Sequence, residues 1–399
     1  MEQTWRWFGP ADAVTLAAAA QAGATGIVTA LHDIPAGEVW TVEAINERKR
    51  LIAADPSLGL QWSVVESLPV AEAIKIGEGD LMTLFDAYST SLRNLAKCGI
   101  RTVCYNFMPV LDWCRTDLAA PVRGGGLALR FNVHEFAAFD CLMLERRGAE
   151  ADYSSAVLDR ARAWFARASE SDKKRLIANI MAGLPGAFDR YDVLGLRVAL
   201  RRYKGIGPAE LRANLARFLR EVVPVAEEVG VRLAIHPDDP PRPLLGLPRV
   251  VSSAEDIAFV LAAHDAEANG LTFCTGSLGA SHANDVPQMA KHFAGRIHFA
   301  HLRNVQKDND GSFGEAEHLG GDTDMVAVVA TLLEEQERRR LAGDPRWRIP
   351  FRPDHGHQLL DDVGKPTHPG YPAIGRLRGM AEIRGVMTAC AASRGYPLQ

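Results

Sequence analysis

Four side chains of types that commonly bind metal ions follow short apolar runs in the second half of the chain. The runs RLAIH, LTFC, RIHFAH and RIPFRPD end in His236, Cys274, His301 and Asp354. Each run has the composition of a buried strand, and a segment long enough for a crossover helix follows each of the first three. In a barrel of parallel strands the carboxyl ends meet at one face, so these side chains would converge. The pattern therefore predicts a metal site.

The ligand types leave the metal and the fourth ligand open. One thiolate, two imidazoles and one carboxylate suit Zn²⁺ or Fe²⁺, whereas Mn²⁺ is less expected beside sulfur. His355 and His357 flank Asp354, and either could replace it as a ligand. His298 lies three residues before His301, and the alternation of side chains along a strand puts the two on opposite faces.

Other polar side chains near the predicted site could transfer protons or bind substrate. If Asp354 binds the metal, His355 could act as a general acid or base, or could orient Asp354 through a hydrogen bond. Tyr371 lies in a loop framed by prolines. It is a packing residue or a phenol whose proton a nearby cation makes easier to remove. Arg303 could bind a substrate carboxylate or form a salt bridge on the rim of the barrel.

Polar residues after the remaining strands could complete the rim of this site. Asp322 lies in the glycine-containing loop after the seventh strand, where it could reach substrate hydroxyls or serve only as a helix cap in a solvated loop. The other candidates for the rim are Arg6, Trp7, His32, Asp33, Glu66, Asn106, His318 and Asp324.

The elements that must position these residues alternate between strand and helix. This alternation predicts an α/β protein, with parallel strands connected by crossover helices. The eight candidate strands suit a closed (β/α)8 TIM barrel better than an open sheet. They span residues 5–8, 26–31, 60–65, 102–107, 232–236, 271–274, 297–301 and 348–353.

The interval between the fourth and fifth strands is far longer than one crossover helix requires. Segment 208–229 is an amphipathic helix, with an apolar side formed by Leu211, Leu215, Phe218, Leu219 and Val222. We interpret residues 108–205 as a helical insertion within a single TIM-barrel domain that covers residues 1–399. An insertion in a loop of the catalytic face usually covers a site or builds a subunit contact.

Composition argues for a soluble, cytoplasmic protein. The net charge of −4 gives no electrostatic case for nucleic acid or an anionic membrane as partner. Six cysteines without a CxxC pair are too few for a disulfide scaffold, and the N-terminus lacks a signal-peptide pattern. Segment 13–31 carries no charge, but Gln21, Gly23 and Gly26 interrupt it. We interpret it as a helix followed by a buried strand rather than a membrane span.

Long motifs spread over nearly the whole chain resemble those of mannonate dehydratases. They include WRWFGPADAVTL, QAGATGIVTALHDIPAGEVW, WSVVESLPVAEAIK, CYNFMPVLDW, AIHPDDPP, FCTGSLG, HFAHLRNV, HLGGDTDM, RPDHGH and PGYPAIGR. The resemblance implies a xylose-isomerase-like TIM barrel and a hydro-lyase that converts D-mannonate to 2-keto-3-deoxy-D-gluconate and water. It also implies one divalent ion per subunit, usually Mn²⁺ or Fe²⁺, and a homodimer or larger assembly.

Carried over motif by motif, the resemblance also implies roles for individual residues. The metal ligands would be His236, Cys274, His301 and Asp354, in AIHPDD, FCTG, HLRN and RPDHGH. His355 in RPDHGH and Tyr371 in PGYP occupy positions proposed as catalytic.

One position departs from the family's pattern. Ala71 stands after ESLPV, where the family usually has a histidine, and this puts efficiency or specificity in question. Two other functions compete with dehydration. A metal-dependent sugar isomerase or epimerase on the same barrel would remove a similar proton without expelling water. A non-catalytic sugar-acid-binding relative would keep the barrel alone.

Overall fold

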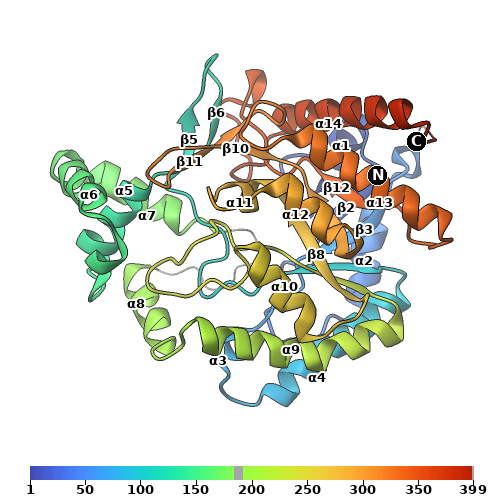
Figure 1. Cartoon of the computed structure of the whole chain (residues 1–399), viewed down its shortest axis with the longest axis horizontal. Coiled ribbons are helices and arrows are strands. Elements are labelled where there is room, and N and C mark those ends of the chain that lie inside the picture. The colour runs from blue at the N-terminus through green and yellow to red at the C-terminus, as the bar shows by residue number, and fades with distance from the viewer. Residues whose placement is uncertain (184–191, 398–399) are drawn as a thin grey trace.

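The computed structural model describes residues 1–183 and 192–397, so part of the predicted insertion, 184–191, lies outside the described residues. Its central feature is a closed barrel of parallel strands with helices around it (Figure 1). Neighbouring strands follow the order β1-β12-β9-β8-β7-β4-β3-β2. Their bounds are β1 (Glu2–Arg6), β2 (Gly26–Thr29), β3 (Gln61–Glu66), β4 (Thr102–Tyr105), β7 (Arg232–Ile235), β8 (Asn269–Cys274), β9 (Ile297–His301) and β12 (Pro350–Arg352).

The predicted TIM barrel is confirmed, and its first strand shows the largest shift in position. Segment 5–8 was expected, whereas β1 spans Glu2–Arg6. Glu2 and Gln3 pair with β12, which closes the barrel. The backbone N–H of Phe8 makes no strand hydrogen bond and instead donates to the Asp12 carboxylate at 2.9 Å. The aromatic residues after Arg6 have high strand propensity, but they lie in the loop at the mouth of the barrel.

A helix follows each barrel strand along the chain, and these helices cover the outside of the barrel. These helices are α1 (Leu16–Gln21), α2 (Val42–Ile52), α4 (Leu81–Lys97), α9 (Pro208–Val229), α10 (Ala254–Ala263), α12 (Val286–Phe293), α13 (Met325–Leu341) and α14 (Ala373–Arg394). Two short helices, α3 (Glu72–Ile76) and α11 (Thr275–Gly279), follow β3 and β8. The uncharged segment 13–31 forms α1 and β2, as expected.

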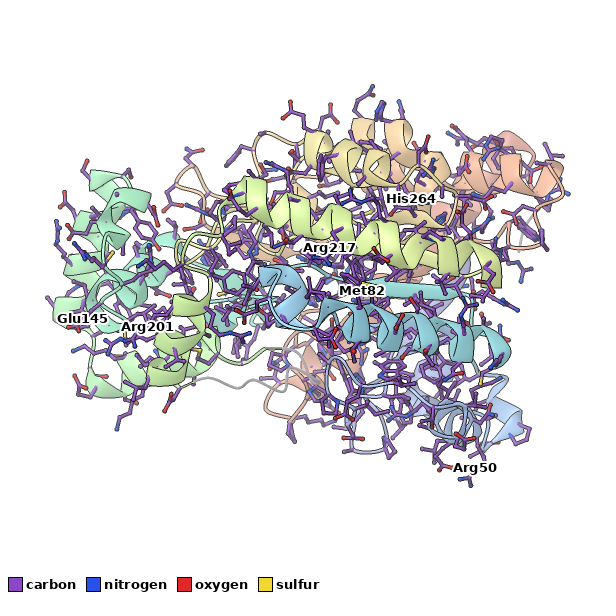
Figure 2. The ribbon with its side chains drawn as sticks, turned by 90° about the horizontal axis from the view of Figure 1, so that it is seen from below. Arg50, Met82, Glu145, Arg201, Arg217 and His264 are labelled. Atoms are coloured by element: carbon purple, nitrogen blue, oxygen red, sulfur yellow. The ribbon has the colours of Figure 1, made fainter. Side chains whose placement is uncertain are left out.

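The helix predicted over 208–229 is confirmed at both ends. Pro208 occupies the first turn, where its missing N–H costs nothing, and Gly230 ends the helix with a left-handed φ of 67°. All five residues expected on its apolar side are buried. Helix α9 packs against α4, and Figure 2 shows the two side by side, with Arg217 labelled on α9 and Met82 on α4.

Apolar side chains fill the inside of the barrel. Val28, Val64, Cys104, Ala234 and Phe299 form a buried cluster of their own, contributed by five different strands. A larger cluster packs between the strands and the surrounding helices. The barrel therefore has a solid floor below its polar mouth, which is the arrangement that supports a site at the strand ends.

The segment after β4 contains the predicted helices and, in addition, a β-hairpin that was not predicted. Strands β5 (Asp117–Pro121) and β6 (Leu127–Phe131) join through Gly124 and Gly125, each with φ near 89°. Glycine tolerates that backbone, and the run of three glycines was a turn signal in the sequence.

This hairpin joins a second hairpin from a distant part of the chain. Strands β10 (Asn304–Lys307) and β11 (Phe313–Ala316) follow β9, and the four strands form an accessory sheet in the order β10-β11-β6-β5. The register places Phe313 opposite Phe131, and their rings stack at 5.7 Å. The accessory sheet therefore ties the insertion to the loop after β9.

The insertion helices lie to one side of the barrel (Figure 1). They are α5 (Val133–Ala138), α6 (Ser155–Arg167), α7 (Glu170–Ile180) and α8 (Val193–Arg202), and they pack around a separate apolar cluster. Figure 2 shows this part of the molecule from below, with Glu145 and Arg201 labelled. Within residues 1–183 and 192–397, none of the helices combines the length and apolar composition needed to cross a bilayer.

Candidate metal centre and active site

The ends of three neighbouring strands bring potential metal ligands together. His236 directly follows β7, Cys274 ends β8 and His301 ends β9. One ligand atom from each lies within 4.8 Å of the other two. Because parallel strands in register end at the same height, neighbouring strand ends deliver their terminal side chains to one point. The structure thus contains a candidate His/Cys/His metal site.

The surroundings of these three residues fit a metal ion. Nε2 of His236 lies 3.1 Å from Nδ1 of His301. The Cys274 sulfur accepts hydrogen bonds from Ser277, at 3.4 Å from its N–H and 3.1 Å from its hydroxyl. Burial lowers the pKa of His236, which favours the neutral imidazole that metals bind.

Asp354 lies beside this cluster, held by two arginines. Its Oδ2 is 3.6 Å from the Cys274 sulfur and accepts from Nε of Arg303 at 2.6 Å, while its Oδ1 accepts from Arg352. Burial would raise the pKa of Asp354, but Arg352, His355, His301 and Arg303 outweigh burial and hold it well below its usual range. The carboxylate is therefore ionised, as a metal ligand must be.

The backbone of Asp354 turns sharply at this point. Its φ is 61°, in the left-handed region that few residues other than glycine adopt. Strain of this kind costs about 1–3 kcal/mol and persists only when the surroundings fix the residue. The two arginine contacts supply that constraint, and the turn places Asp354 and His355 in the same cavity.

Arg352 connects the candidate metal site to the third strand. It donates to both carboxylate oxygens of Glu66, at 2.7 and 3.0 Å, and to Nε2 of His301 at 3.1 Å. Arg6 pairs with the same carboxylate. Burial opposes the charge of Glu66, but Arg352 and Arg6 outweigh burial and hold its pKa well below the usual range. Arg6 thus lies next to a buried anion, whereas it was expected to contact substrate.

Arg303 is buried in a cluster of anionic groups. It is 1 % exposed and donates to Asp239 at 2.6 Å, to Glu315 at 2.9 Å and to the Ser277 hydroxyl at 3.1 Å, in addition to Asp354. These contacts use all three of its guanidinium nitrogens. The salt-bridge alternative considered for Arg303 therefore describes its position better than a free guanidinium facing substrate.

The two catalytic candidates, His355 and Tyr371, pack against each other. Their rings lie 5.2 Å apart at 86°, and Nε2 of His355 is 3.7 Å from Oδ1 of Asp354. The Tyr371 hydroxyl is 3.5 Å from Nη1 of Arg352. Burial, the largest effect, raises the pKa of Tyr371 to about 12 although Arg352 opposes it, so the phenol is protonated near neutral pH.

One cavity at the mouth of the barrel collects most of these groups. It is lined by Glu66, Ser67, Asn106, Met108, Asp112, Trp113, His236, Asp239, Arg352, Asp354, His355 and Tyr371. Asn106 is therefore the predicted substrate-binding residue that the structure places at this cavity. Titratable, amide and aromatic groups in one small space can hold a polyhydroxylated anion and move its protons.

Several predicted residues lie away from the cavity. Asp322 accepts from the backbone N–H of Lys307 at 2.8 Å and helps to hold the β10–β11 hairpin. Asp324 caps α13 and His318 bonds the carbonyl of Pro353, so both have structural partners. His298 bonds the carbonyl of Glu267 and is not among the described residues that line the cavity.

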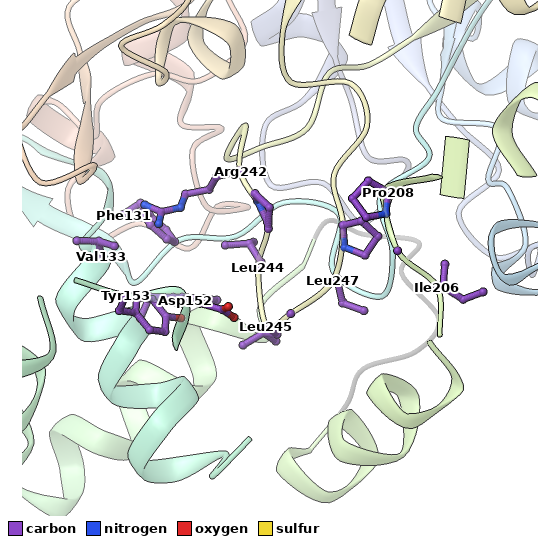
Figure 3. A pocket seen from close by; sticks show the side chains of 15 residues that line it. Phe131, Val133, Asp152, Tyr153, Ile206, Pro208, Arg242, Leu244, Leu245 and Leu247 are labelled. Carbon is purple, nitrogen blue, oxygen red and sulfur yellow. The ribbon is translucent and has the colours of Figure 1, made fainter. Parts of the chain in front are cut away.

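A larger hollow, of about 460 Å³, lies between the insertion and the loop after β7 (Figure 3). Leu244, Leu245 and Leu247 line much of it, so most of its surface is apolar. Its Asp152 already pairs with Arg146 at 2.6 Å. The described residues that line this hollow do not bring titratable groups together as the strand ends do, so the smaller cavity remains the candidate active site.

Comparisons with known proteins agree on one family. A family model for D-mannonate dehydratase matches residues 1–395. The chain belongs to the mannonate dehydratase family. It is 60% identical over 390 residues to a mannonate dehydratase of Chromohalobacter salexigens, covering 98% of each chain. It is 53% identical over 392 residues to that of Rhizobium meliloti, covering 98% of this chain and 97% of the relative.

A solved structure supports the same family at the level of the fold. The crystal structure of mannonate dehydratase from Streptococcus suis serotype 2 is 34% identical to this chain and superposes with a TM-score of 0.76. The match covers 99% of this chain and 95% of that one. The resemblance read from the motifs, the barrel and the assignment as a hydro-lyase are confirmed.

The departure from the family pattern lies outside the candidate active site. Ala71 is buried at the start of α3, and it is absent from the described residues that line the site cavity. It lines a different, smaller hollow together with Leu68 and Tyr88.

Sequence reasoning missed four charged residues that build the site. Arg352 lies within the predicted strand 348–353, and Asp239 follows the predicted strand 232–236, so their places in RIPFRPD and AIHPDDP were available signals. No sequence signal pointed to Arg115 or Glu315. Glu315 reaches the site from the accessory sheet, and Arg115 reaches it from the segment that leads into that sheet. Only the pairing between distant segments brings them there.

Proposed function

We propose that this dehydratase converts D-mannonate into 2-keto-3-deoxy-D-gluconate and water at the cavity shared by His236, Asp354, His355 and Tyr371. One observation carries the proposal. Within this cavity two groups able to move protons, His355 and Tyr371, are in ring contact beside the candidate metal site. Elimination of water from a sugar acid needs two proton transfers near a site that stabilises negative charge.

His236, Cys274 and His301 would hold a divalent ion, with Asp354 as the fourth ligand, and we propose Mn²⁺ or Fe²⁺ as that ion. The donor set supports this, because two imidazoles, a sulfur and an ionised carboxylate lie side by side. A bound divalent cation would stabilise the negative charge that develops on the substrate's carboxylate and C2 oxygen, an effect worth several kcal/mol.

His355 and Tyr371 would carry the two proton transfers. One takes the C2 proton, and the C–H electron pair passes toward the substrate's carboxylate before it forms the C2–C3 double bond. The other gives its proton to the C3 hydroxyl, whose C–O bond breaks to release water. The resulting enol then becomes the 2-keto acid by taking a proton at C3 while its C2 hydroxyl loses a proton. General acid–base assistance of this kind contributes about 10²- to 10⁴-fold in rate.

The remaining lining residues would orient the substrate. Asn106 lines the cavity and could hydrogen-bond sugar hydroxyls, while Trp113 offers an apolar wall. Arg303 acts indirectly in this proposal, by fixing Asp354.

We also propose that the chain works in the cytoplasm as a homodimer or larger assembly. All six of its cysteines are free thiols, which suits a reducing compartment. Leu194 and Val198 on α8 are 67% and 56% exposed, so the insertion offers apolar surface for a subunit contact. Light scattering coupled to size exclusion would report the assembly directly.

Identification of the product in D₂O tests the proposed reaction. A dehydratase would yield 2-keto-3-deoxy-D-gluconate carrying solvent deuterium at C3, as read by NMR and mass spectrometry. A product with unchanged elemental composition and deuterium at C2 would instead establish an isomerase or epimerase.

A further inference from the structure

Glu315 reaches the active site from outside the barrel. It lies on β11 of the accessory sheet, its side chain is 5% exposed, and its Oε1 is 2.9 Å from Nδ1 of His355. The same oxygen accepts from Nη1 of Arg303 at 2.9 Å and from Nη2 of Arg115 at 3.1 Å. A buried carboxylate therefore contacts the imidazole on the side away from Asp354, which faces Nε2.

The two arginines keep this carboxylate ionised and in place. Burial would raise the pKa of Glu315, but Arg303, His355 and Arg115 outweigh burial and lower it to about 2. An ionised carboxylate can only accept hydrogen bonds. The bond to His355 therefore requires the imidazole to carry its proton on Nδ1.

Packing fixes the plane of the same imidazole. The Trp113 ring lies 5.9 Å from the His355 ring at 76°, and the Tyr371 ring lies 5.2 Å away at 86°. With Nδ1 bonded to Glu315, Nε2 is the nitrogen left for proton transfer. A histidine whose second nitrogen bonds a carboxylate is held in one tautomer and one orientation.

We propose that Glu315 is a positioning residue for the dehydration, which holds His355 with Nδ1 protonated and Nε2 available to the substrate. The inference rests on the proposed role of His355 as a proton-transfer group. It also gives the accessory sheet a function, because pairing of β11 with β6 fixes the strand that carries Glu315. Arg115, two residues before β5 of the insertion, anchors the carboxylate from the insertion side.

Steady-state kinetics of four variants tests the proposal. Glu315→Gln removes the charge with little change of shape, and we expect kcat to fall about 10- to 100-fold with KM and bound metal nearly unchanged. Glu317→Gln is the matched control. Glu317 follows the same strand but is exposed and pairs with Arg378 at 2.9 Å, so its kcat should equal that of the wild type.

The third and fourth variants separate this inference from the proposed function. If Glu315 acts through His355, then Glu315→Gln/His355→Asn is no slower than His355→Asn alone. Losses that multiply in the double variant would overturn the positioning role. A slow His355→Asn variant beside an unaffected Glu315→Gln variant would overturn it too, while leaving the proposed function intact. A fully active His355→Asn variant would contradict both.

The tautomer gives a readout that does not depend on the stability of any Glu315 variant. The full-length wild type, loaded with diamagnetic Zn²⁺ and labelled with ¹⁵N-histidine, should show a protonated Nδ1 and a bare Nε2 for His355. The ¹⁵N resonances of His355 are assigned as those that are missing from the spectrum of the His355→Asn variant. A proton found on Nε2 instead would overturn the proposal.

Discussion

Nε of Arg303 donates to Oδ2 of Asp354 at 2.6 Å. Arg303 follows β9 and Asp354 follows β12, and these two strands are neighbours in the barrel although the residues are 51 positions apart in the chain. The same guanidinium also neutralises Asp239 and Glu315. Arg303 thus joins the proposed fourth metal ligand to the carboxylate that contacts His355. A residue expected to bind substrate is placed where it can align both the ligand and the proton-transfer group.

Arg303→Met should strongly destabilise the protein. The substitution leaves Asp239, Glu315 and Asp354 partly uncompensated in a buried site, and breaking buried ion pairs from one side costs about 3–5 kcal/mol. Denaturant unfolding of the metal-free variant measures this cost. Arg93→Met removes an exposed partner of Glu228 and should cost less than about 1 kcal/mol. Equal losses in the two variants would show that the buried network contributes no special stability.

Cys274→Ser should bind metal at least about 100-fold more weakly than the wild type, because a hydroxyl is a poor substitute for a thiolate ligand. Isothermal titration with Mn²⁺, together with metal analysis of the purified protein, measures the change. Cys141 lies in the insertion, outside the candidate site, so Cys141→Ser serves as the control. Metal binding by Cys274→Ser that matches the control would remove Cys274 from the ligand set.

His355→Asn and Tyr371→Phe should each retain metal while losing about 10²- to 10⁴-fold in kcat, since each removes one proton-transfer group. In D₂O, the variant that lacks only the acid should still exchange the substrate's C2 hydrogen, and the variant that lacks the base should not. His292→Asn, on the exposed surface, is the control. Turnover of both variants within a few-fold of this control would refute the assignment.

Acid should destabilise the metal-free fold through its buried carboxylates. The pKa of Glu315 falls from 4.5 to about 2 on folding, so between these values the unfolded chain binds more protons than the folded one. The stabilisation is complete above about pH 4.5 and disappears as the pH falls toward 2. Melting temperatures across this range should drop more steeply for the wild type than for Glu315→Gln. Parallel curves would show that Glu315 ionises alike in both states.

The barrel and the centre of the site follow from local patterns in the sequence. Strands such as Ile297–His301 are short apolar runs, and terminal residues of parallel strands converge whatever the loops do. Arg303 shows where such reasoning stops. Its position at a strand end suggested substrate, but its partners Asp239 and Glu315 come from other segments. Local sequence patterns cannot predict a buried ion network, because the partner of each charged side chain comes from a distant segment that only the tertiary structure brings close.

The insertion illustrates the same limit. Its helices show a clear helical periodicity in the sequence. The β5–β6 hairpin, by contrast, gains stability because β6 pairs with β11 of a distant hairpin. The triple glycine at 124–126 marked the turn, but nothing nearby marked the partner strand. Glu315 was missed for this reason.

The most direct test of the metal-dependent reaction is product formation by chelator-stripped protein as Mn²⁺ or Fe²⁺ is added back. Without metal, we expect no 2-keto-3-deoxy-D-gluconate to form from D-mannonate. Activity should then rise in proportion to bound ion and stop rising at one ion per chain. Full activity in the stripped protein, or none with any divalent ion despite full loading, would contradict the proposed site.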